Sequence, residues 1–173
     1  MSLVVLLGGA RAGKSALAQE LAARWEGPVA YVATAEARDE EMAERIERHR
    51  RERPEGWMTV EEPLELRAVL ERLEHGQAAV VDCLTLWVSN VLERGDSPTA
   101  VLAEAGEAAA LAAAHPAPVI VVSNEVGLGI VPASPLARVY RDLLGAVNRA
   151  FVDEAETASL VVAGRMLRLE RPA

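Results

Sequence analysis

The feature that most constrains this chain is an eight-residue segment near its start, Gly8-Gly9-Ala10-Arg11-Ala12-Gly13-Lys14-Ser15. It matches the pattern G-x-x-x-x-G-K-[ST] and lies between an apolar run and a segment with helical spacing. Gly8 and Gly13 allow backbone torsions that are closed to other residues, so successive N–H groups can turn inward around a phosphate. The positive end of the following helix points at the same anion. The segment therefore predicts a strand, a phosphate-binding loop and a helix in succession.

Two side chains of this loop carry specific chemistry. Lys14 is expected to reach the outer phosphates of a nucleotide, and the Ser15 hydroxyl is placed to ligate Mg²⁺. Lys14 is the only lysine among the 18 lysine and arginine residues of the chain. The site requires a compact point charge rather than a planar guanidinium, which explains this exception. The loop is therefore interpreted as a nucleotide site and not as a chance glycine-rich turn.

Composition limits the class of protein. The chain has 173 residues, of which 51% are hydrophobic but only 3% aromatic, so we expect one domain, residues 1–173, with an aliphatic core. A net charge of −8 argues against general nucleic-acid binding. The single cysteine excludes an internal disulfide and a cysteine metal cluster. Neither a signal peptide nor an apolar run long enough to cross a membrane is recognisable, which predicts a soluble cytoplasmic protein.

Strand-like and helix-like segments alternate along the chain, which predicts a mostly parallel sheet covered by helices. Strands are expected at 3–7, 29–33, 57–61, 78–82, 119–122 and 159–163, and helices at 15–25, 36–53, 63–74, 84–94, 99–114 and 135–154. Residues 166–169 are expected to close a terminal hairpin. Thr34 and Ala35 follow the second strand at its carboxyl end, which is where parallel sheets bind ligands.

The strand expected at 78–82 ends in an acidic residue, Asp82. In nucleotide-binding folds of this type, a carboxylate at such a position meets Mg²⁺ directly or through water. The pattern alone is weak, because many strands end in aspartate, but beside a phosphate-binding loop it favours Asp82 as a metal ligand together with Ser15. Cys83, the next residue, is interpreted as small buried filler and not as a nucleophile.

The charged segment at 36–53 contains one mixed face. Met42, Arg45, Ile46, His49 and Arg53 recur at three- and four-residue spacing, so they are expected to lie along one side of a helix. His49 is surrounded in sequence by arginines, a cluster that would collect phosphate in an otherwise acidic chain. Such surroundings favour the neutral imidazole, which can attack phosphorus. From the residues alone, a surface histidine without a role is an equal alternative.

The chain also resembles a known family, the bifunctional adenosylcobinamide kinase / adenosylcobinamide-phosphate guanylyltransferases of cobalamin biosynthesis, the bacterial CobU type. The resemblance covers nearly the whole length. It rests on the loop 8–15; on residues 40–46 leading to His49; on Arg53-Pro54, Trp57, Thr59 and Glu61; and on residues 124–132, continued by Ala137-Arg138, Arg141-Asp142, Gly145 and Asn148.

This resemblance implies a P-loop NTPase domain with a RecA-like sheet and a homotrimer. It implies Mg²⁺ as cofactor, ATP and GTP as substrates, and adenosylcobinamide and its phosphate as partners. It implies two reactions: phosphorylation of adenosylcobinamide, and then transfer of GMP from GTP through a guanylyl-histidine at His49, giving adenosylcobinamide-GDP and pyrophosphate. Lys14 and His49 are the implied catalytic residues.

The nucleotide contacts implied by the motif and the resemblance extend beyond these two residues. They are Gly8, Gly9, Ala10, Arg11, Ala12, Gly13, Lys14, Ser15, Ala33, Thr34, Ala35, Arg50, Arg51, Glu52, Arg53, Glu61 and Asp82. Some family members carry Glu at the position of Asp82, and some carry Gln at the position of Arg149. Neither departure removes a reacting group.

Two other functions use the same loop. A different small-molecule kinase would need Lys14 and Asp82 but not His49, and a nucleotide-dependent switch would need no turnover at all. The chain lacks a long flexible switch segment, and its arginine-rich helix is tied to a single histidine. Both features speak against the switch.

Overall fold

The computed structural model describes residues 3–51 and 53–171. Its elements are, in chain order, β1 (Leu3–Gly8), α1 (Lys14–Ala22), β2 (Val29–Ala33), α2 (Glu40–Arg51), β3 (Met58–Glu61), α3 (Leu66–Glu71), β4 (Ala78–Asp82), α4 (Leu84–Arg94), α5 (Pro98–Ala114), β5 (Val119–Asn124), α6 (Pro135–Glu154), β6 (Thr157–Val162) and β7 (Arg165–Leu169). None of the helices in the described residues is long and apolar enough to cross a membrane.

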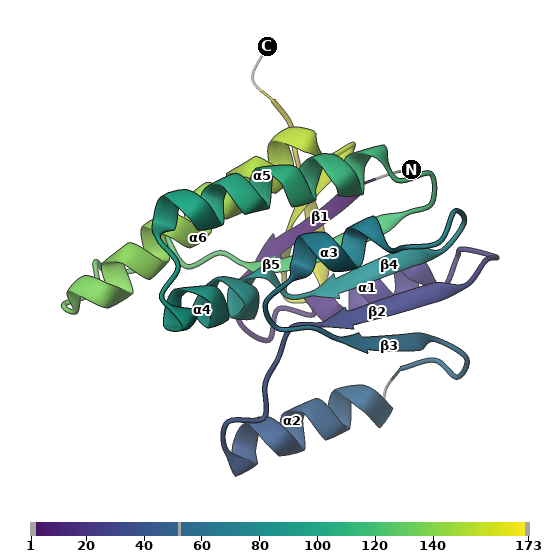
Figure 1. Ribbon diagram of the computed structural model, residues 1–173, viewed down its shortest axis with the longest axis horizontal. Helices are drawn as coiled ribbons and strands as arrows, with labels where there is room; N and C mark the ends of the chain where they lie inside the picture. Colours follow the sequence, from purple (N-terminus) through teal and green to yellow (C-terminus); the bar gives the residue numbers. More distant parts are fainter. Residues whose placement is uncertain (1–2, 52, 172–173) are drawn as a thin grey trace.

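The strands form one 7-stranded sheet in the order β3-β2-β4-β5-β1-β6-β7. All neighbouring pairs are parallel except β6 and β7, which pair antiparallel as a hairpin (Figure 1). The prediction of a mostly parallel sheet with a terminal hairpin is confirmed. In this order the two strands that carry the loop and the strand-end acid, β1 and β4, both border β5, so their carboxyl ends lie near each other.

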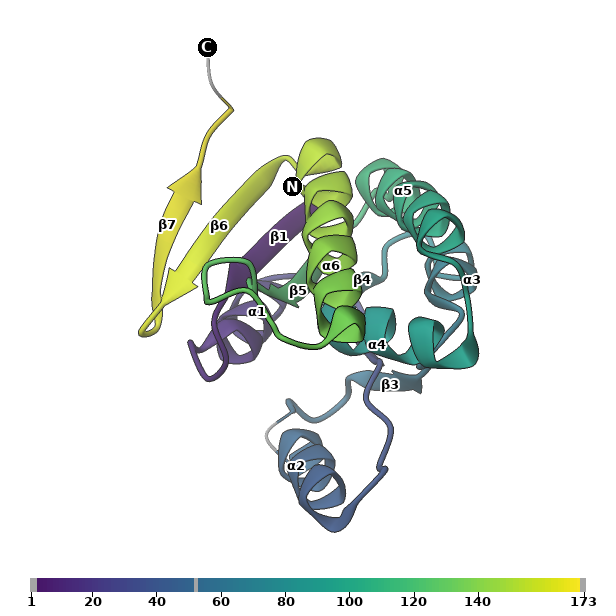
Figure 2. The same ribbon diagram turned by 90° about the vertical axis from the view of Figure 1, so that its left-hand side faces the viewer.

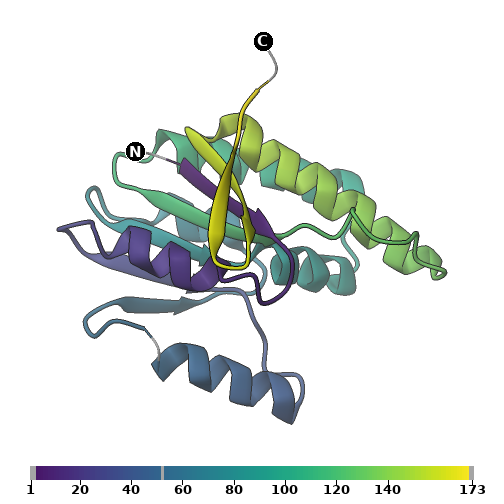
Figure 3. The same cartoon turned by 180° about the vertical axis from the view of Figure 1, so that it is seen from behind.

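Helices cover both faces of the sheet, but unequally. Helices α3, α4, α5 and α6 lie on one face, and α1 lies on the other (Figures 1 and 3). Side chains of β1 alternate between the two, because Leu3 and Val5 pack toward the four helices while Val4 and Leu6 pack under α1. A parallel sheet that is buried on both faces needs continuous apolar strands, and this is the pattern of the sequence.

Helix α2 stands apart from both layers. None of its residues, 40–51, is buried, and it lies beyond the β3 edge of the sheet (Figure 2). The helix expected at 36–53 is wrong at its start, because the Asp39 carboxylate accepts a hydrogen bond of 2.7 Å from the Met42 N–H and so begins the helix later. Arg38 donates to Glu36 and to Asn90, which ties the preceding segment to α4.

Most other boundaries follow the expectation. The strands at 29–33 and 78–82 and the helix at 84–94 are confirmed to the residue. The helix expected at 63–74 is shorter, because the Glu62 carboxylate accepts hydrogen bonds of 3.0 Å from the N–H groups of both Leu64 and Glu65. That pair of bonds shapes a turn where the sequence suggested a first helical turn.

Candidate active site

The phosphate-binding loop has the backbone that its sequence requires. Gly13 adopts φ 97°, in the left-handed region that favours glycine. A Cβ added at Gly8 would lie 2.3 Å from the Val161 carbonyl oxygen, so only glycine allows β1 and β6 to approach here. The Gly164 N–H donates a hydrogen bond of 2.8 Å to the Ala12 carbonyl oxygen. The turn of the β6–β7 hairpin therefore supports the loop from behind.

The Lys14 side chain folds back onto this loop. Its Nζ atom donates to the carbonyl oxygens of Gly8 and Gly9, at 2.9 Å and 2.7 Å. Burial lowers the pKa of Lys14, and the neighbouring Cys83 and Asp82 act in the opposite direction. The ammonium is thus partly removed from water and lies at the loop where phosphate oxygens bind, which strengthens its attraction for an anion.

A cavity of about 380 Å³ opens in front of the loop. Its lining combines the loop and α1 residues 10–16, the α2 residues Glu41, Arg45, Arg48 and His49, and residues from the ends of β4 and β5 and the start of α4, namely Asp82, Cys83, Thr85, Leu86, Val122 and Asn124. We call this the phosphate cavity. It brings together the predicted loop residues from Ala10 to Ser15 with His49 and Asp82.

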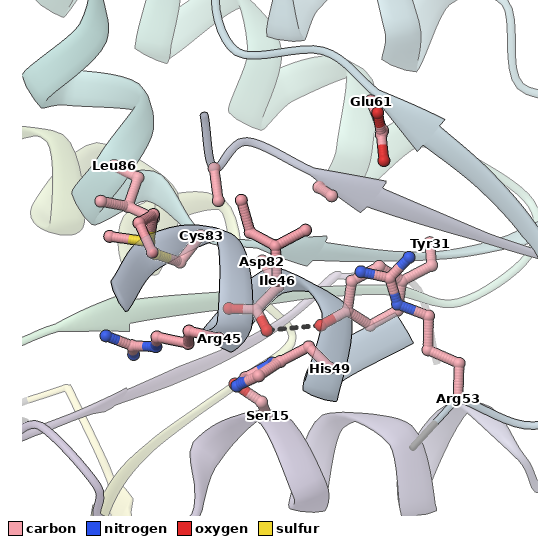
Figure 4. A pocket seen from close by; sticks show the side chains of 13 residues that line it. Ser15, Tyr31, Arg45, Ile46, His49, Arg53, Glu61, Asp82, Cys83 and Leu86 are labelled. Carbon is pink, nitrogen blue, oxygen red and sulfur yellow. Dashed lines mark hydrogen bonds between the residues drawn. The ribbon is translucent and has the colours of Figure 1, made fainter. Parts of the chain in front are cut away.

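A second, narrower hollow of about 70 Å³ adjoins the first, between α2 and the strands β2 and β3 (Figure 4). Its lining includes Tyr31, Ala33, Ala35, Met42, Ile46, Arg53 and Glu61. We call this the nucleoside hollow. The mixed face predicted for the helix at 36–53 is confirmed for its four residues on α2, and the fifth, Arg53, lines the same hollow from beyond the end of α2.

His49 lies where the two spaces meet. It lines both the phosphate cavity and the nucleoside hollow, together with Ser15, Arg45 and Asp82. Figure 4 shows the imidazole on the side of α2 that faces Ser15 and Asp82. A nucleotide whose phosphates lie in the loop and whose nucleoside lies in the hollow would pass directly by this ring.

The carboxylate of Asp82 is held by Tyr31. The Tyr31 hydroxyl donates a hydrogen bond of 2.5 Å to Asp82 Oδ2 (Figure 4). Burial, and then the adjacent Asp82 charge, raise the pKa of Tyr31, so the phenol remains a donor at any working pH. The bond fixes one carboxylate oxygen and leaves Oδ1 turned away from the ring.

The donor set at this place suits Mg²⁺. Within the described residues, no group of three or more His, Cys, Asp or Glu side chains could hold a metal ion by itself. Ser15 and Asp82, however, line the same two spaces and offer a hydroxyl and a carboxylate. Mg²⁺ characteristically binds one or two such oxygens and completes its shell with water and substrate phosphates.

Arg53 and Glu61 form the far side of the nucleoside hollow. The Arg53 guanidinium lies 4.0 Å above the centroid of the Tyr31 ring and donates to Thr59 Oγ1 at 2.9 Å. Its Nε atom is buried, and no acceptor for it lies among the residues that the structure describes. Arg50 forms an ion pair with Glu61, which links α2 to β3. The hollow thus offers a free donor at Arg53 and a carboxylate at Glu61.

The predicted contacts Thr34 and Arg51 lie away from both spaces. Thr34 is fully buried, and its hydroxyl donates to the Cys83 carbonyl oxygen and accepts from the Cys83 N–H, at 2.7 Å and 2.8 Å. Strand alternation instead presents Ala33 and Ala35 to the hollow. Arg51 is exposed, donates to the Glu47 carbonyl oxygen of its own helix at 3.4 Å, and lines neither space. Glu52 falls outside the described residues.

Cys83 is only partly buried and lines both the phosphate cavity and the nucleoside hollow, so the prediction of a buried filler is wrong about its burial. Burial raises the pKa of its thiol to about 11, with a smaller contribution from Asp82. A thiol that stays protonated at neutral pH is a poor nucleophile, although Cys83 lies beside the site.

Sequence reasoning did not single out Tyr31 or assign a role to Asn124. Tyr31 lies within an apolar strand and has no local sequence signal. Only the pairing of β2 with β4 places its hydroxyl near the strand-end acid, Asp82. Asn124 is the last residue of β5, which lies between the strands of the loop and of Asp82, so strand order was needed to place it at the cavity.

Known proteins share the fold and much of the sequence of this chain. A solved structure titled "Crystal structure of the RadB recombinase" superposes with a TM-score of 0.52 at 19% identity, over 92% of this chain and 73% of that chain. This likeness confirms the RecA-like fold and nothing beyond the fold.

Curated relatives match almost the whole length. The chain is 44% identical over 167 residues to the bifunctional adenosylcobalamin biosynthesis protein CobP of Pseudomonas aeruginosa, with 96% of both chains covered. It is 38% identical over 175 residues to the bifunctional adenosylcobalamin biosynthesis protein CobU of Escherichia coli, with 94% of this chain and 96% of the relative covered. A family model described as "Cobinamide kinase / cobinamide phosphate guanyltransferase" matches residues 4–169, and the chain therefore belongs to this CobU family.

Proposed function

We propose that this protein is a bifunctional enzyme of adenosylcobalamin biosynthesis. It phosphorylates adenosylcobinamide with ATP or GTP, and it then transfers GMP from GTP to adenosylcobinamide phosphate. Membership of the CobU family and the names of the relatives support both activities. The observation that carries the proposal is the position of His49, which lines both the phosphate cavity and the nucleoside hollow.

In the kinase reaction, the terminal hydroxyl oxygen of the aminopropanol arm bonds to the γ-phosphorus. The bond from that phosphorus to the β,γ-bridging oxygen breaks, the nucleoside diphosphate leaves, and the hydroxyl proton passes to water. Lys14 and the backbone N–H groups of the loop hold the phosphates and stabilise their charge. Ser15 and Asp82 would hold Mg²⁺, which neutralises phosphate charge when bound.

In the transferase reaction, an imidazole nitrogen of His49 bonds to the α-phosphorus of GTP, while the bond to the α,β-bridging oxygen breaks and pyrophosphate leaves. The imidazole loses its proton to water. A phosphate oxygen of adenosylcobinamide phosphate then bonds to the same phosphorus, the phosphorus–nitrogen bond breaks, and the imidazole takes up a proton from water, which regenerates His49. A covalent intermediate suits this transfer, because the two large substrates need not react while both are bound.

The nucleoside hollow fits the guanine nucleotide in this scheme. The Glu61 carboxylate can accept from the N1–H and amino groups of guanine, and the buried Arg53 Nε offers a donor to its carbonyl oxygen. Arg50 competes for Glu61 in the absence of nucleotide. We therefore propose that GTP binding exchanges this exposed ion pair for contacts with the base.

The remaining expectations belong to the same proposal: a single domain, a cytoplasmic location and a homotrimer. Exposed aliphatic side chains on the outer hairpin, Met166, Leu167 and Leu169, support an association between subunits.

The direct test incubates the protein with adenosylcobinamide and either ATP or GTP, followed by identification of the corrinoid products by mass. We expect adenosylcobinamide phosphate with either nucleotide, and adenosylcobinamide-GDP only when GTP is present. Phosphorylation without guanylylation would favour a kinase alone, and no turnover of either kind would favour the nucleotide-dependent switch.

A further inference from the structure

The segment between β5 and α6, residues 125–134, has a distinctive position. It leaves the sheet at the carboxyl end of β5, next to the phosphate-binding loop, and projects beyond the edge of the sheet with the first turn of α6 (Figures 2 and 3). The Glu125 N–H donates to the Gly8 carbonyl oxygen at 3.1 Å, so the segment starts in contact with the loop. It is the longest stretch of the family resemblance, and neither proposed reaction uses it.

The side chains of this segment are exposed and apolar. Leu128 is 84% exposed, Ile130 is 97% exposed and Val131 is 62% exposed. Leu136, in the first turn of α6, adds a further 69% exposed side chain. Elsewhere the aliphatic side chains of the described strands and helices mostly pack into two cores, so several exposed apolar side chains so close together in the sequence indicate a contact surface.

The backbone of the segment is held in place by charged side chains. The Glu125 carboxylate accepts a hydrogen bond from the Gly127 N–H, and the Arg138 guanidinium donates to the carbonyl oxygens of Pro132 and Ala133 at 2.9 Å and 2.7 Å. Both ends are thus fixed from within the chain. The apolar side chains therefore lie between two anchored ends of the segment, which limits the backbone freedom lost when a ligand binds.

Asn124 joins this surface to the phosphate cavity. Its side chain lines the cavity, while Thr85 Oγ1 accepts from its N–H at 2.7 Å and Asn148 Nδ2 donates to its carbonyl oxygen at 3.0 Å. The opposite wall of the cavity is formed by α2, which also borders the nucleoside hollow. A nucleotide bound there leaves the Asn124 side as the approach for a second substrate.

We propose that residues 125–134 and the first turn of α6 form the docking surface for the corrinoid ring of adenosylcobinamide. This inference rests on the function proposed above. A corrinoid is a broad macrocycle edged with methyl and amide groups, so Leu128, Ile130 and Val131 cover its apolar parts while its aminopropanol arm reaches past Asn124 to the γ-phosphate. Adenosylcobinamide carries a net positive charge, which suits a chain of net charge −8.

A second copy of the chain is the alternative binding partner for this surface. The corrinoid is favoured because the surface begins at the phosphate cavity, where the acceptor hydroxyl of the kinase reaction and the acceptor phosphate of the transferase reaction must arrive. A subunit contact has no such requirement. The exposed aliphatic side chains of β7 also offer the trimer a different surface.

The test compares the double variant Leu128→Gln/Ile130→Gln with the control Leu102→Gln. Leu102 is 40% exposed on α5 and takes no part in the proposed surface, so the control measures the effect of one exposed Leu-to-Gln change. Because the replaced side chains contact water in the free protein, both proteins should fold. We expect the KM for adenosylcobinamide in the kinase reaction to rise at least tenfold in the double variant and to stay unchanged in the control.

Two further measurements separate the outcomes. Uptake of GMP from GTP needs no corrinoid, so it should be unchanged in the double variant, as should the KM for ATP. An unchanged KM for adenosylcobinamide in the double variant would overturn the inference. A changed number of subunits, measured by light scattering, would assign the surface to the assembly and also overturn it. Failure of the wild-type protein to act on adenosylcobinamide would instead refute the proposed function.

Discussion

At the scale of single residues, the site depends on side chains whose neighbours fix both their position and their charge. Lys14 bonds to two carbonyl oxygens of its own loop, and Asp82 receives the Tyr31 hydroxyl. Both arrangements hold a charged group at the cavity before a ligand arrives. Preorganised charge of this kind is the main resource for phosphoryl and nucleotidyl transfer, which need little other chemistry from the protein.

Replacement of Lys14 by alanine tests the loop. Lys14→Ala should weaken ATP and GTP binding at least 100-fold, because about 3 kcal/mol of charge-assisted hydrogen bonding to phosphate is lost. Both activities should fall with nucleotide binding. The free energy of unfolding should fall by only about 1 kcal/mol, because the two carbonyl oxygens that accept from Lys14 can accept from water instead. Isothermal titration and thermal unfolding measure the two effects. Wild-type nucleotide affinity in a folded variant would refute the assignment of this loop as the nucleotide phosphate site.

The hydroxyl of Tyr31 is a positioning group, which gives a sharper prediction. Tyr31→Phe keeps the ring under Arg53 but removes the donor to Asp82, so the Mg²⁺ concentration for half-maximal kinase activity should rise about tenfold. Asp82→Asn should have a larger effect in the same assay and little effect on thermal stability. An unchanged Mg²⁺ dependence in Tyr31→Phe would mean that the hydroxyl serves packing only.

At the scale of elements, the sequence predicted the strands and most helices because Gly, Pro and strand-end polar residues mark their limits. It also predicted the inward face of α2, since helical spacing alone selects Met42, Ile46 and His49. It misplaced Thr34, because it took three consecutive residues as nucleotide contacts. In an extended chain, successive side chains point to opposite faces. Tyr31 and Asn124 required strand register and strand order, which depend on long-range pairing and leave no local pattern.

Helix α2 carries the proposed nucleophile, His49, but packs little against the rest of the protein. None of its residues is buried, and the ion pair between Arg50 and Glu61 is exposed, so this pair adds little to the stability of the helix. We expect amides of α2 to exchange with solvent much faster than those of α5, and to become protected when GTP bridges α2 to the loop. Hydrogen exchange followed by mass spectrometry measures this. Equal protection of α2 and α5 without nucleotide would show that the helix is firmly docked already.

At the scale of the whole molecule, one edge of the sheet collects every group that the reactions need. The loop, Asp82 and Asn124 lie at the carboxyl ends of adjacent strands, α2 closes one side, and the segment 125–134 extends from the other. The chain as a whole is acidic, with a net charge of −8, yet arginines gather on α2. Helix α2 also carries four glutamates, so it is not positive as a whole, but Arg45 and Arg48 line the phosphate cavity and attract nucleotide phosphates to the side of the site that holds His49.

A homotrimer is the prediction for the assembled molecule. Light scattering should give three times the chain mass of 18.5 kDa at working concentrations. Charged substitutions at Leu167 and Leu169, on the exposed hairpin, should reduce the measured mass while leaving nucleotide binding in place. A monomeric wild-type protein would remove this prediction, and an intact trimer in the variant would move the interface to another surface.

The central claim is that His49 carries GMP as a covalent intermediate, and labelled GTP tests it most directly. Label at the α-phosphate should stay with the wild-type protein through denaturation, should be lost in acid and kept in alkali, and should pass to adenosylcobinamide phosphate on its addition. Label at the γ-phosphate should not be retained, and His49→Ala should take up neither label while keeping part of the kinase activity. Retention of the α-label by the His49→Ala protein would contradict the account, because the nucleophile would then lie elsewhere.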